Sequence, residues 1–370
     1  MRKLPGTSTL AVAFALTTLA ACGGDEGATP GAMTQQTASE AGTMTLTGAG
    51  ATFPYPIYSK WFSSYADLEP VRVNYQSIGS GGGIRQLTEG TVDFGASDAP
   101  MNAGELERAP GTLHLPTVVG AIAVTYNLPG VEETLKLNGA VLDAIFRGEI
   151  GEWDHPSIQS LNPGVALPDR DILVVHRSDG SGTTYVFTDY LSTVSPTWRE
   201  MVGTGKSVDW PVGLGAKGNE GVTGQVEQTD GSIGYVEQVY AQQNELPMAA
   251  IENQSGEFVV PTLAATTAAA EGVASELTED SSFGVSIVDA PGESAYPIAA
   301  WTYLLVPPNM PSCEKARALA ELYEWALTDG SDMARETGYA PLPANLRELA
   351  LERWQSVTCG PDSAPVLPAS

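Results

Sequence analysis

Four short segments of this sequence are rich in glycine, serine and threonine, the residue types that surround bound anions. They are residues 48–54, 78–83, 95–100 and 177–183. Three of them run directly into helix-patterned sequence. The start of a helix leaves backbone N–H groups unpaired and carries about half a positive charge, so it can hold an anion without a metal. Convergence of three such starts predicts a site for one tetrahedral oxyanion.

The segment from Arg177 to Thr183 carries the most chemical information. A guanidinium group is a planar fork that matches an oxyanion with two hydrogen bonds, and Asp179 is close enough in sequence to fix its orientation. Ser181, Gly182 and Thr183 offer hydroxyl and N–H donors at the next helix start. The alternative is an Arg–Asp pair on a surface turn.

Two further segments offer donors of the same kind. Thr52 and Phe53 stand just before a predicted helix, where their N–H groups point forward and Thr52 adds a hydroxyl. Ser80 lies among glycines, which let the backbone approach a ligand closely. An ordinary helix cap is the alternative for Thr52.

Asp98 is unusual among the candidate anion-binding residues, because a carboxylate accepts hydrogen bonds and repels anions. It fits the site if the anion brings a proton, as hydrogen phosphate does and sulfate at neutral pH does not. Sites that recognise a hydroxyl discriminate by about 10⁴- to 10⁵-fold. The alternative is a helix cap or a turn before Pro100.

Composition limits the possible partners. The chain has 370 residues, 42% of them hydrophobic and 17% charged, which is enough for two domains with full cores. Its formal net charge of −26 argues against nucleic acid and anionic membrane surfaces as partners. Because salt screens exposed charges beyond about 8 Å, the donors inside a cleft outweigh this global charge.

The N-terminus has the features of a secretory signal: a basic start, a short apolar run over residues 10–21, and Cys22 directly after it. Residues 19–22 resemble the lipobox of bacterial lipoproteins, in which the cysteine is lipidated. We therefore expect a signal peptide over residues 1–21 and a lipidated Cys22 followed by a flexible tether to residue 42. Ordinary cleavage that leaves a free thiol is the alternative.

Cys313 and Cys359 remain as an even pair in an exported protein, which predicts a disulfide. A helix pattern begins at Cys313 and another ends near Cys359, so two antiparallel helices would bring the thiols together. A disulfide that closes the segment between Cys313 and Cys359 into a loop would stabilise the fold by about 4 kcal/mol in the chain-entropy model. Two reduced thiols are the alternative. The proline-containing residues 360–370 are expected to form a disordered tail.

Strand-like and helix-like patterns alternate along the chain, which favours an α/β fold. Helices are predicted at residues 57–65 and 184–191. Strands are predicted at residues 71–75, 92–94, 117–126, 172–175, 232–236 and 298–306.

Several other segments resemble functional motifs without meeting the requirements of those motifs. Residues 203–207 fail as a P-loop because Glu200 stands where glycine is required. Residues 213–218 spell a dinucleotide motif, but no clear strand precedes them and no obvious helix is expected to begin there. His114, His155 and His176 are scattered, so neither a metal site nor a cofactor is expected.

Six collinear segments together resemble the PstS-type phosphate-binding proteins of bacterial phosphate ABC transporters. These are residues 46–54, 73–83, 91–100, 177–183, 210–219 and 231–237, and the likeness extends from about Met44 to Trp354. Many members carry arginine where this chain has His176, and some have a second serine at Gly81. The cysteine pair is not a general family feature.

The resemblance implies a type II periplasmic-binding-protein fold, with two α/β lobes joined by two crossover strands. Lobe one is expected at residues 43–116 and 298–359, and lobe two at 117–297. Asp179 would support Arg177. The implied phosphate ligands are Thr52, Phe53, Ser80, Asp98, Arg177, Ser181, Gly182 and Thr183.

The expected protein is an extracytoplasmic, lipid-anchored monomer that captures inorganic phosphate and hands it to an ABC permease without catalysis. One alternative is binding of another oxyanion, such as sulfate or molybdate, for which Asp98 is the discriminating residue. A second is a secreted phosphatase with Ser181 as nucleophile, although only His176 could serve as a nearby base. A surface adhesin or sensor of the same family is the third.

Overall fold

The computed structural model describes residues 43–274 and 284–367. The predicted signal peptide, Cys22 and the tether lie outside the described residues. Within the two described ranges, no helix has the length and apolar character needed to cross a bilayer.

A single hydrogen-bonded path of strands runs through the protein in the order β2-β1-β3-β11-β4-β8-β6-β7, with β13 paired to β4. The strands β1, β2 and β3 are parallel, as are β6, β7 and β8. The strand bounds are β1 Met44–Gly50, β2 Val71–Ser77, β3 Phe94–Ser97, β4 Leu113–Tyr126, β6 Leu173–Arg177, β7 Leu214–Ala216, β8 Ser232–Glu237, β11 Ala299–Val306 and β13 Ala340–Pro341.

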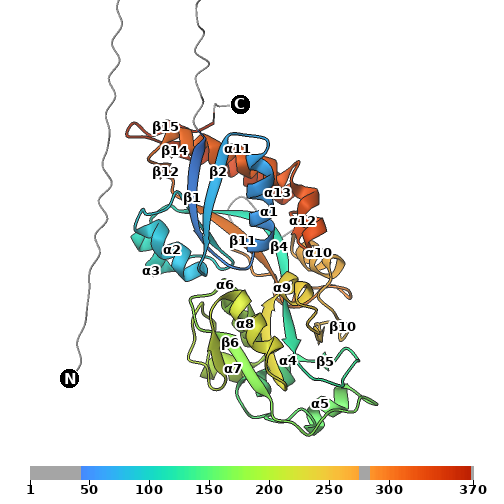
Figure 1. Cartoon of the computed structure of the whole chain (residues 1–370). Helices are drawn as coiled ribbons and strands as arrows, with labels where there is room; N and C mark the ends of the chain where they lie inside the picture. The colour runs from blue at the N-terminus through green and yellow to red at the C-terminus, as the bar shows by residue number, and fades with distance from the viewer. Residues whose placement is uncertain (1–42, 275–283, 368–370) are drawn as a thin grey trace, which may run out of the picture. The chain divides into compact units, whose positions relative to one another are not determined.

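The long strand β4 belongs to both halves of this path. It pairs with β11 as far as Ala121 and with β8 from Ile122 onward. The chain returns beside it, where the Ile122 N–H donates to the Ile298 carbonyl (2.8 Å), and then enters β11. Figure 1 shows the resulting two α/β lobes, with blue and red elements in one and green and yellow elements in the other.

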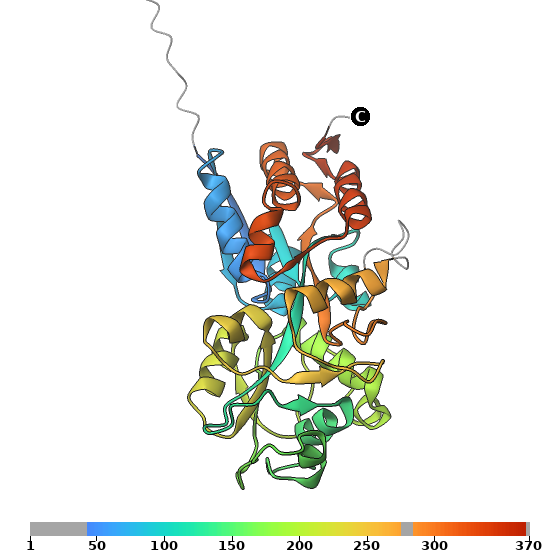
Figure 2. The same ribbon diagram turned by 90° about the vertical axis from the view of Figure 1, so that its right-hand side faces the viewer.

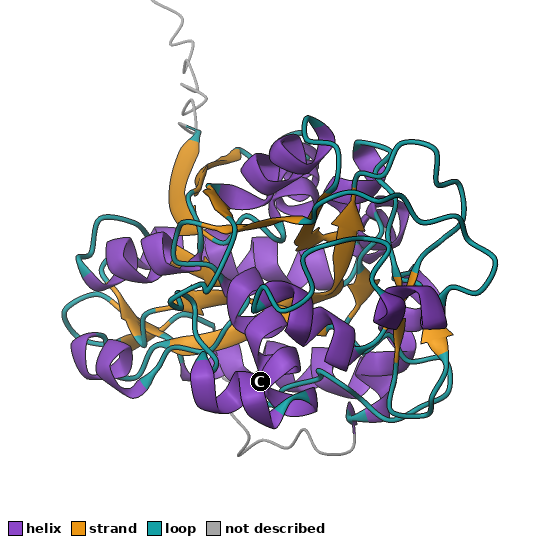
Figure 3. Ribbon diagram, turned by 90° about the horizontal axis from the view of Figure 1, so that it is seen from below, coloured by secondary structure: helices purple, strands orange, loops and turns teal. Residues whose placement is uncertain are grey.

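Helices surround the strands, as the purple and orange colouring of Figure 3 shows. The first lobe contains α1 Tyr55–Ala66, α2 Ser80–Thr88, α3 Ala103–Arg108, α11 Cys313–Leu327, α12 Ser331–Thr337, α13 Ala344–Arg353 and the 3-10 turn η3 Trp354–Ser356. The second contains α4 Gly139–Phe146, α5 Pro156–Leu161, α6 Gly182–Val194, α7 Pro196–Met201, α8 Gly218–Glu227 and α9 Gln238–Gln243. The helix α10, Leu263–Gly272, packs against β4, β11 and β13, where the lobes meet (Figure 2).

Two small sheets complete the fold. One contains β5 Lys136–Leu137, β9 Ala250–Glu252 and β10 Phe258–Val259, and the other contains β12 Asn309–Met310, β14 Thr358–Cys359 and β15 Ala364–Pro365. The core lies along β4 and β11, because all of β11 and nearly all of β4 are buried.

The predicted helices and strands are present, with one strand displaced. The sequence predicts a strand at residues 92–94, whereas β3 runs from Phe94 to Ser97. Its small residues Gly95 and Ala96 are buried between β1 and β11, which pair with it on either side. An apolar pattern does not identify a strand whose neighbours leave room only for small side chains.

The predicted disulfide between Cys313 and Cys359 is confirmed. Cys313 is the first residue of α11, but Cys359 lies on the strand β14 and not at the end of a helix. The expectation of a disordered tail also differs from the structure. Up to residue 367 the chain is ordered, because β15 pairs with β14 and Val366 is buried. Residues 368–370 lie outside the described part.

Candidate functional site

The segments singled out in the sequence meet where the two lobes face one another. In lobe one, the site is formed by the turn before α1, the start of α2 and the end of β3; in lobe two, by the end of β6 and the start of α6. The strands β1, β3 and β6 end here, and ligand sites of α/β sheets form at such strand ends. All eight predicted ligands are buried: Thr52, Phe53, Ser80, Asp98, Arg177, Ser181, Gly182 and Thr183.

Arg177 is held in one orientation by its partners. Its Nε and Nη2 donate to the two carboxylate oxygens of Asp179 at 2.8 and 2.6 Å, and its Nη1 donates to Thr183 Oγ1 at 3.3 Å. The Arg177 side chain is only 1% exposed. Although burial disfavours the Asp179 charge, the bonds from Arg177 outweigh it and lower the pKa of this carboxyl. The site therefore contains a fixed and partly neutralised cation.

The turn at Thr52 and Phe53 is held by two tyrosines. The Tyr240 hydroxyl donates to the Thr52 carbonyl at 2.5 Å, and the Tyr339 hydroxyl donates to the Phe53 carbonyl at 2.6 Å. Asn219 donates to Thr52 Oγ1 from its backbone N (3.2 Å) and from Nδ2 (2.7 Å), which leaves the Thr52 hydroxyl proton free to donate elsewhere.

Several backbone donors at the site have no hydrogen-bond partner in the described residues. They are the N–H groups of Thr52, Phe53, Ser80 and Thr183. Buried N–H groups are nearly always paired, so four orphans in buried residues at one place require an explanation. An oxyanion accepting from them would satisfy all four.

Ser80 and Gly182 bring the lobes into direct contact. Ser80 Oγ accepts from the Gly182 N–H (3.0 Å) and from the Asp98 N–H (3.3 Å), and the Gly81 N–H donates to the Gly180 carbonyl (2.9 Å). A Cβ atom added at Gly182 would lie 2.6 Å from the Asp98 Cβ. Glycine is therefore required where α6 approaches the end of β3.

Asp98 has the properties of a carboxyl that can exchange a proton near neutral pH. Its Oδ1 accepts from Thr302 Oγ1 at 2.8 Å. Burial raises the pKa of Asp98 to about 7, against the opposing effects of Thr302, Arg177 and Ser80. Asp98 does not cap the helix that follows, because Asn102 caps α3. This carboxyl can thus accept a hydrogen bond from an anion that carries a proton.

Ser181 has a structural use that the sequence left open. Its hydroxyl oxygen accepts from the Thr184 N–H at 3.0 Å and caps α6. Because the oxygen acts as acceptor in this bond, the hydroxyl proton remains a donor. A helix cap and an anion donor are therefore compatible at this residue.

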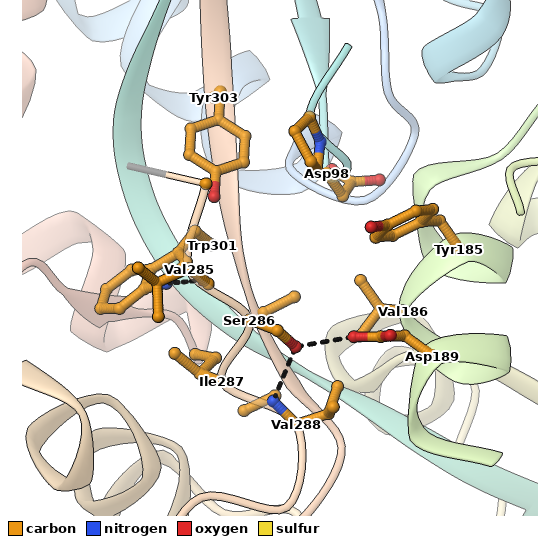
Figure 4. A pocket seen from close by; sticks show the side chains of 14 residues that line it. Asp98, Tyr185, Val186, Asp189, Val285, Ser286, Ile287, Val288, Trp301 and Tyr303 are labelled. Atoms are coloured by element: carbon orange, nitrogen blue, oxygen red, sulfur yellow. Dashed lines mark hydrogen bonds between the residues drawn. The ribbon is translucent and has the colours of Figure 1, made fainter. Parts of the chain in front are cut away.

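A small cavity lies beside Asp98, on the side of α6 (Figure 4). Its volume of about 30 Å³ is enough for a water molecule. Tyr185 and Asp189 line it from α6, and Ser286 Oγ donates to Asp189 Oδ2 at 2.7 Å across it. Asp98 is the one predicted ligand among its lining residues, so this cavity is separate from the cluster of unpaired N–H groups.

Sequence reasoning missed the residues that hold the ligands in place. These are Asn219, Tyr235, Glu237, Tyr240, Thr302 and Tyr339. Asn219 and Glu237 lie in segments that carried the family resemblance, but no chemical property of those segments indicated their partners. The helix α8 begins at Gly218, where the sequence was expected to open no obvious helix, and this helix start positions Asn219.

Comparison with known proteins identifies the family. The PBP superfamily domain matches residues 35–329. The phosphate-binding protein PstS of Pasteurella multocida is 45% identical over 313 residues, which cover 84% of this chain and 90% of that protein. The chain belongs to the PstS family. PstS of Methanocaldococcus jannaschii is another relative, 40% identical over 331 residues, which cover 84% of this chain and 85% of that protein.

Solved structures agree on the fold of this family member. A phosphate-binding protein from Stenotrophomonas maltophilia superposes with a TM-score of 0.65 at 18% identity, over 84% of this chain and 94% of its own. A high-affinity periplasmic phosphate-binding protein, PfluDING, superposes with a TM-score of 0.64 at 20% identity, over 82% of this chain and 92% of its own length. At these identities the likeness shows the fold alone, and it confirms the predicted type II periplasmic-binding-protein architecture.

Proposed function

We propose that this protein binds inorganic phosphate between its lobes and delivers it to an ABC permease for import. One observation carries the proposal: a buried carboxyl, Asp98, faces the same site as a fixed arginine and a group of unpaired N–H donors. The donors fit an oxyanion, and the carboxyl fits one that retains a proton. The names of the relatives, phosphate-binding protein PstS, support the same ligand.

The predicted ligands divide into donors and one acceptor. Thr52 donates from N–H and hydroxyl and Phe53 from its N–H, while Arg177 supplies the cation. Ser80, Ser181 and Thr183 supply further donors across the two lobes, and Asp98 accepts a hydrogen bond from the protonated phosphate oxygen. The Gly182 N–H donates to Ser80 Oγ in this structure, so it would have to turn from Ser80 to the anion on binding. Burial supports this assignment, because hydrogen bonds to a charged group are stronger away from water.

The remaining expectations belong to the same proposal. Lobe one spans residues 43–116 and 298–359, and lobe two spans 117–297. A signal peptide over residues 1–21 exports the chain, Cys22 carries the lipid, and the mature protein is an extracytoplasmic monomer. The extracytoplasmic disulfide between Cys313 and Cys359 is consistent with export.

The phosphatase alternative is not supported by the surroundings of Ser181. A serine nucleophile needs a base within hydrogen-bond reach. His176 is engaged elsewhere, since its ring stacks on Trp210 at 4.9 Å and its Nδ1 lies 3.1 Å from the Arg177 carbonyl. Burial also lowers the pKa of His176. We therefore propose a binding protein and not an enzyme.

Calorimetry tests the proposal directly. The purified protein is freed of carried-over phosphate by partial unfolding and refolding, then titrated with phosphate and separately with sulfate. We expect one-to-one binding of phosphate and no heat with sulfate. The Asp98→Asn variant should bind sulfate detectably, because a carboxamide can donate to an unprotonated oxygen. Sulfate binding by the wild-type protein would overturn phosphate selectivity, and silence with both anions would overturn the function.

A further inference from the structure

Glu237 connects the crossover between the lobes to the turn that holds Thr52 and Phe53. It ends β8 and pairs with Ile122 at the point where β4 changes partner. Its backbone N–H donates to Asn219 Oδ1 at 2.9 Å, and Asn219 in turn donates to the Thr52 hydroxyl. One side of this residue is thus already tied to a proposed phosphate ligand.

The Glu237 side chain reaches the neighbouring ligand through Tyr339. Its Oε2 accepts from the Val239 N–H at 2.9 Å and lies 2.9 Å from the Tyr339 hydroxyl oxygen. That same hydroxyl lies 2.6 Å from the Phe53 carbonyl oxygen. Glu237 is fully buried, and in the described part of the chain its Oε1 has no hydrogen-bond partner.

Counting protons at Tyr339 shows which protonation state fits this geometry. The hydroxyl carries one proton, and the shorter contact assigns it to the Phe53 carbonyl, which can only accept. The contact between the Tyr339 hydroxyl oxygen and Glu237 Oε2 then has no proton to form a hydrogen bond unless the Glu237 carboxyl carries one. An ionised Glu237 would also be a buried charge with one oxygen unpaired and, among residues 43–274 and 284–367, no cation bonded to it, which proteins avoid.

The electrostatic surroundings favour the same protonation state. Burial raises the pKa of Glu237 well above its usual range, against the bonds from Tyr339 and Val239. The nearby Asp98 raises it further. The titratable groups facing Glu237 are Asp98 after β3, Tyr240 on α9 and Tyr339 before β13.

We propose that Glu237 is a neutral carboxylic acid that positions the anion-binding turn by donating a hydrogen bond to Tyr339. Tyr339 passes this constraint to the Phe53 carbonyl. Tyr240 holds the peptide bond between Thr52 and Phe53 by donating to the Thr52 carbonyl. The N–H of this peptide bond belongs to Phe53 and points the opposite way, into the site. With both peptide planes fixed, the Phe53 donor needs no reorganisation to bind an anion. This inference rests on the proposed phosphate function.

At alkaline pH the ionisation of Glu237 would change this arrangement. When Glu237 ionises, the Tyr339 proton turns toward the new carboxylate and leaves the Phe53 carbonyl. Phosphate affinity should then fall with the ionisation of Glu237. Phosphate and Asp98 also change protonation near neutral pH, so this loss must be measured relative to a variant that cannot ionise at position 237.

Two substitutions at Glu237 and one at Tyr339 test the positioning role. Glu237→Leu and Tyr339→Phe should each weaken phosphate binding about five- to tenfold, the loss expected for one hydrogen bond. Glu237→Gln, whose NH2 group can donate to Tyr339 but cannot accept from the Val239 N–H as Oε2 does, should recover part of the affinity that Glu237→Leu loses. It should also lack the extra alkaline decline of the wild-type protein. A stronger affinity in Glu237→Gln would show that a buried charge had been removed, and would overturn the proposal.

Infrared difference spectroscopy gives a readout that does not depend on binding. At pH 8 the wild-type spectrum minus that of Glu237→Gln should contain the carbonyl stretch of a protonated carboxylic acid, and Tyr339→Phe should shift that band. If Glu237→Gln fails to fold, the same band is sought in the wild-type protein after isotopic labelling of its glutamates. Absence of the band would overturn the proposal. Absence of phosphate binding in a protein that shows the band would instead refute the proposed function.

Discussion

At the scale of single residues, the site combines one cation with one carboxyl that opposes it. Arg177 is orientated by two bonds to Asp179, and Asp98 is buried beside the same donors. A site of donors alone would accept any oxyanion of suitable size. In the proposed site the carboxyl would restrict binding to an anion with a proton to give, so affinity and selectivity would belong to different side chains.

Replacing Arg177 by alanine should weaken phosphate binding at least 100-fold. The anion would lose its cation, and hydrogen bonds to charged groups contribute about 1.5–3 kcal/mol each. Asp179, left without its partner, would repel the anion as well. Titration calorimetry measures the change, with Arg170→Ala as the control because Arg170 forms an exposed pair with Asp230. Affinity within threefold of wild type in Arg177→Ala would contradict the assignment.

The raised pKa of Asp98 predicts how the stability of the phosphate-free protein depends on pH. Because the folded-state pKa of about 7 lies above the reference value of 3.8, the folded state binds the proton more tightly. This stabilisation is complete below pH 3.8 and is lost as the pH rises through 7. The difference corresponds to as much as about 4 kcal/mol.

Urea unfolding of phosphate-free wild type and Asp98→Asn between pH 4 and pH 8 measures this contribution. The free energy of unfolding of the wild type should decline with rising pH relative to that of the variant, which cannot ionise at this position. Parallel pH profiles would show that Asp98 titrates normally in the folded protein.

At the scale of elements, the site is built from turns that follow strand ends, and other contacts hold the two lobes against one another. The clearest contact joins α3 of lobe one to the turn after α7 of lobe two. Lys206 Nζ donates to Glu105 Oε2 at 2.6 Å and to the Pro100 carbonyl at 3.3 Å, with both charged side chains only 12% exposed. The Lys206 carbonyl also accepts from the Ser181 N–H, at the start of α6.

Lys206→Met should therefore weaken phosphate binding about fivefold by removing this contact between the lobes. Loss of a largely buried ion pair of this kind is worth about 1 kcal/mol or more, since screening by water is limited. Stopped-flow measurement should show the change as faster release. Lys60→Met is the matched control, because Lys60 pairs with Glu336 at an exposed position within lobe one. An equal effect of the two substitutions would indicate a general charge effect.

At the scale of the whole molecule, the binding of an anion by a protein of formal net charge −26 requires the local donors to outweigh the distant acidic residues. The net negative charge mainly slows the approach of the anion, because it repels the anion before the donors are within reach. Salt screens this repulsion over about 10 Å at 0.1 M ionic strength.

The association rate constant for phosphate should consequently rise as salt is added from low ionic strength. Stopped-flow experiments with a non-binding chloride salt measure it, and the dissociation rate provides the internal comparison because it is set by buried contacts. An association rate that falls with salt would reveal a local basic funnel and contradict the expected repulsion.

Much of the fold and of the candidate site follows from local sequence. Alternating patterns gave the α/β class, and an even cysteine count gave the disulfide, although Cys359 proved to lie on a strand. The donors gather because each follows a strand end. The strand at residues 92–94 was misplaced, since Gly95 and Ala96 are small for reasons that only their neighbours explain.

What the sequence by itself determined is the set of residue types in the candidate binding segments: glycine, hydroxyl and arginine side chains at helix starts, and one carboxyl among them. Only the tertiary structure decided how those groups are held. Thr302 bonds to Asp98 across 204 positions, and Tyr339 bonds to Phe53 across 286. Glu237 also acquires its fully buried surroundings from residues distant in sequence. Local periodicity reports which face of an element is buried, but the partner met there depends on how the whole chain packs.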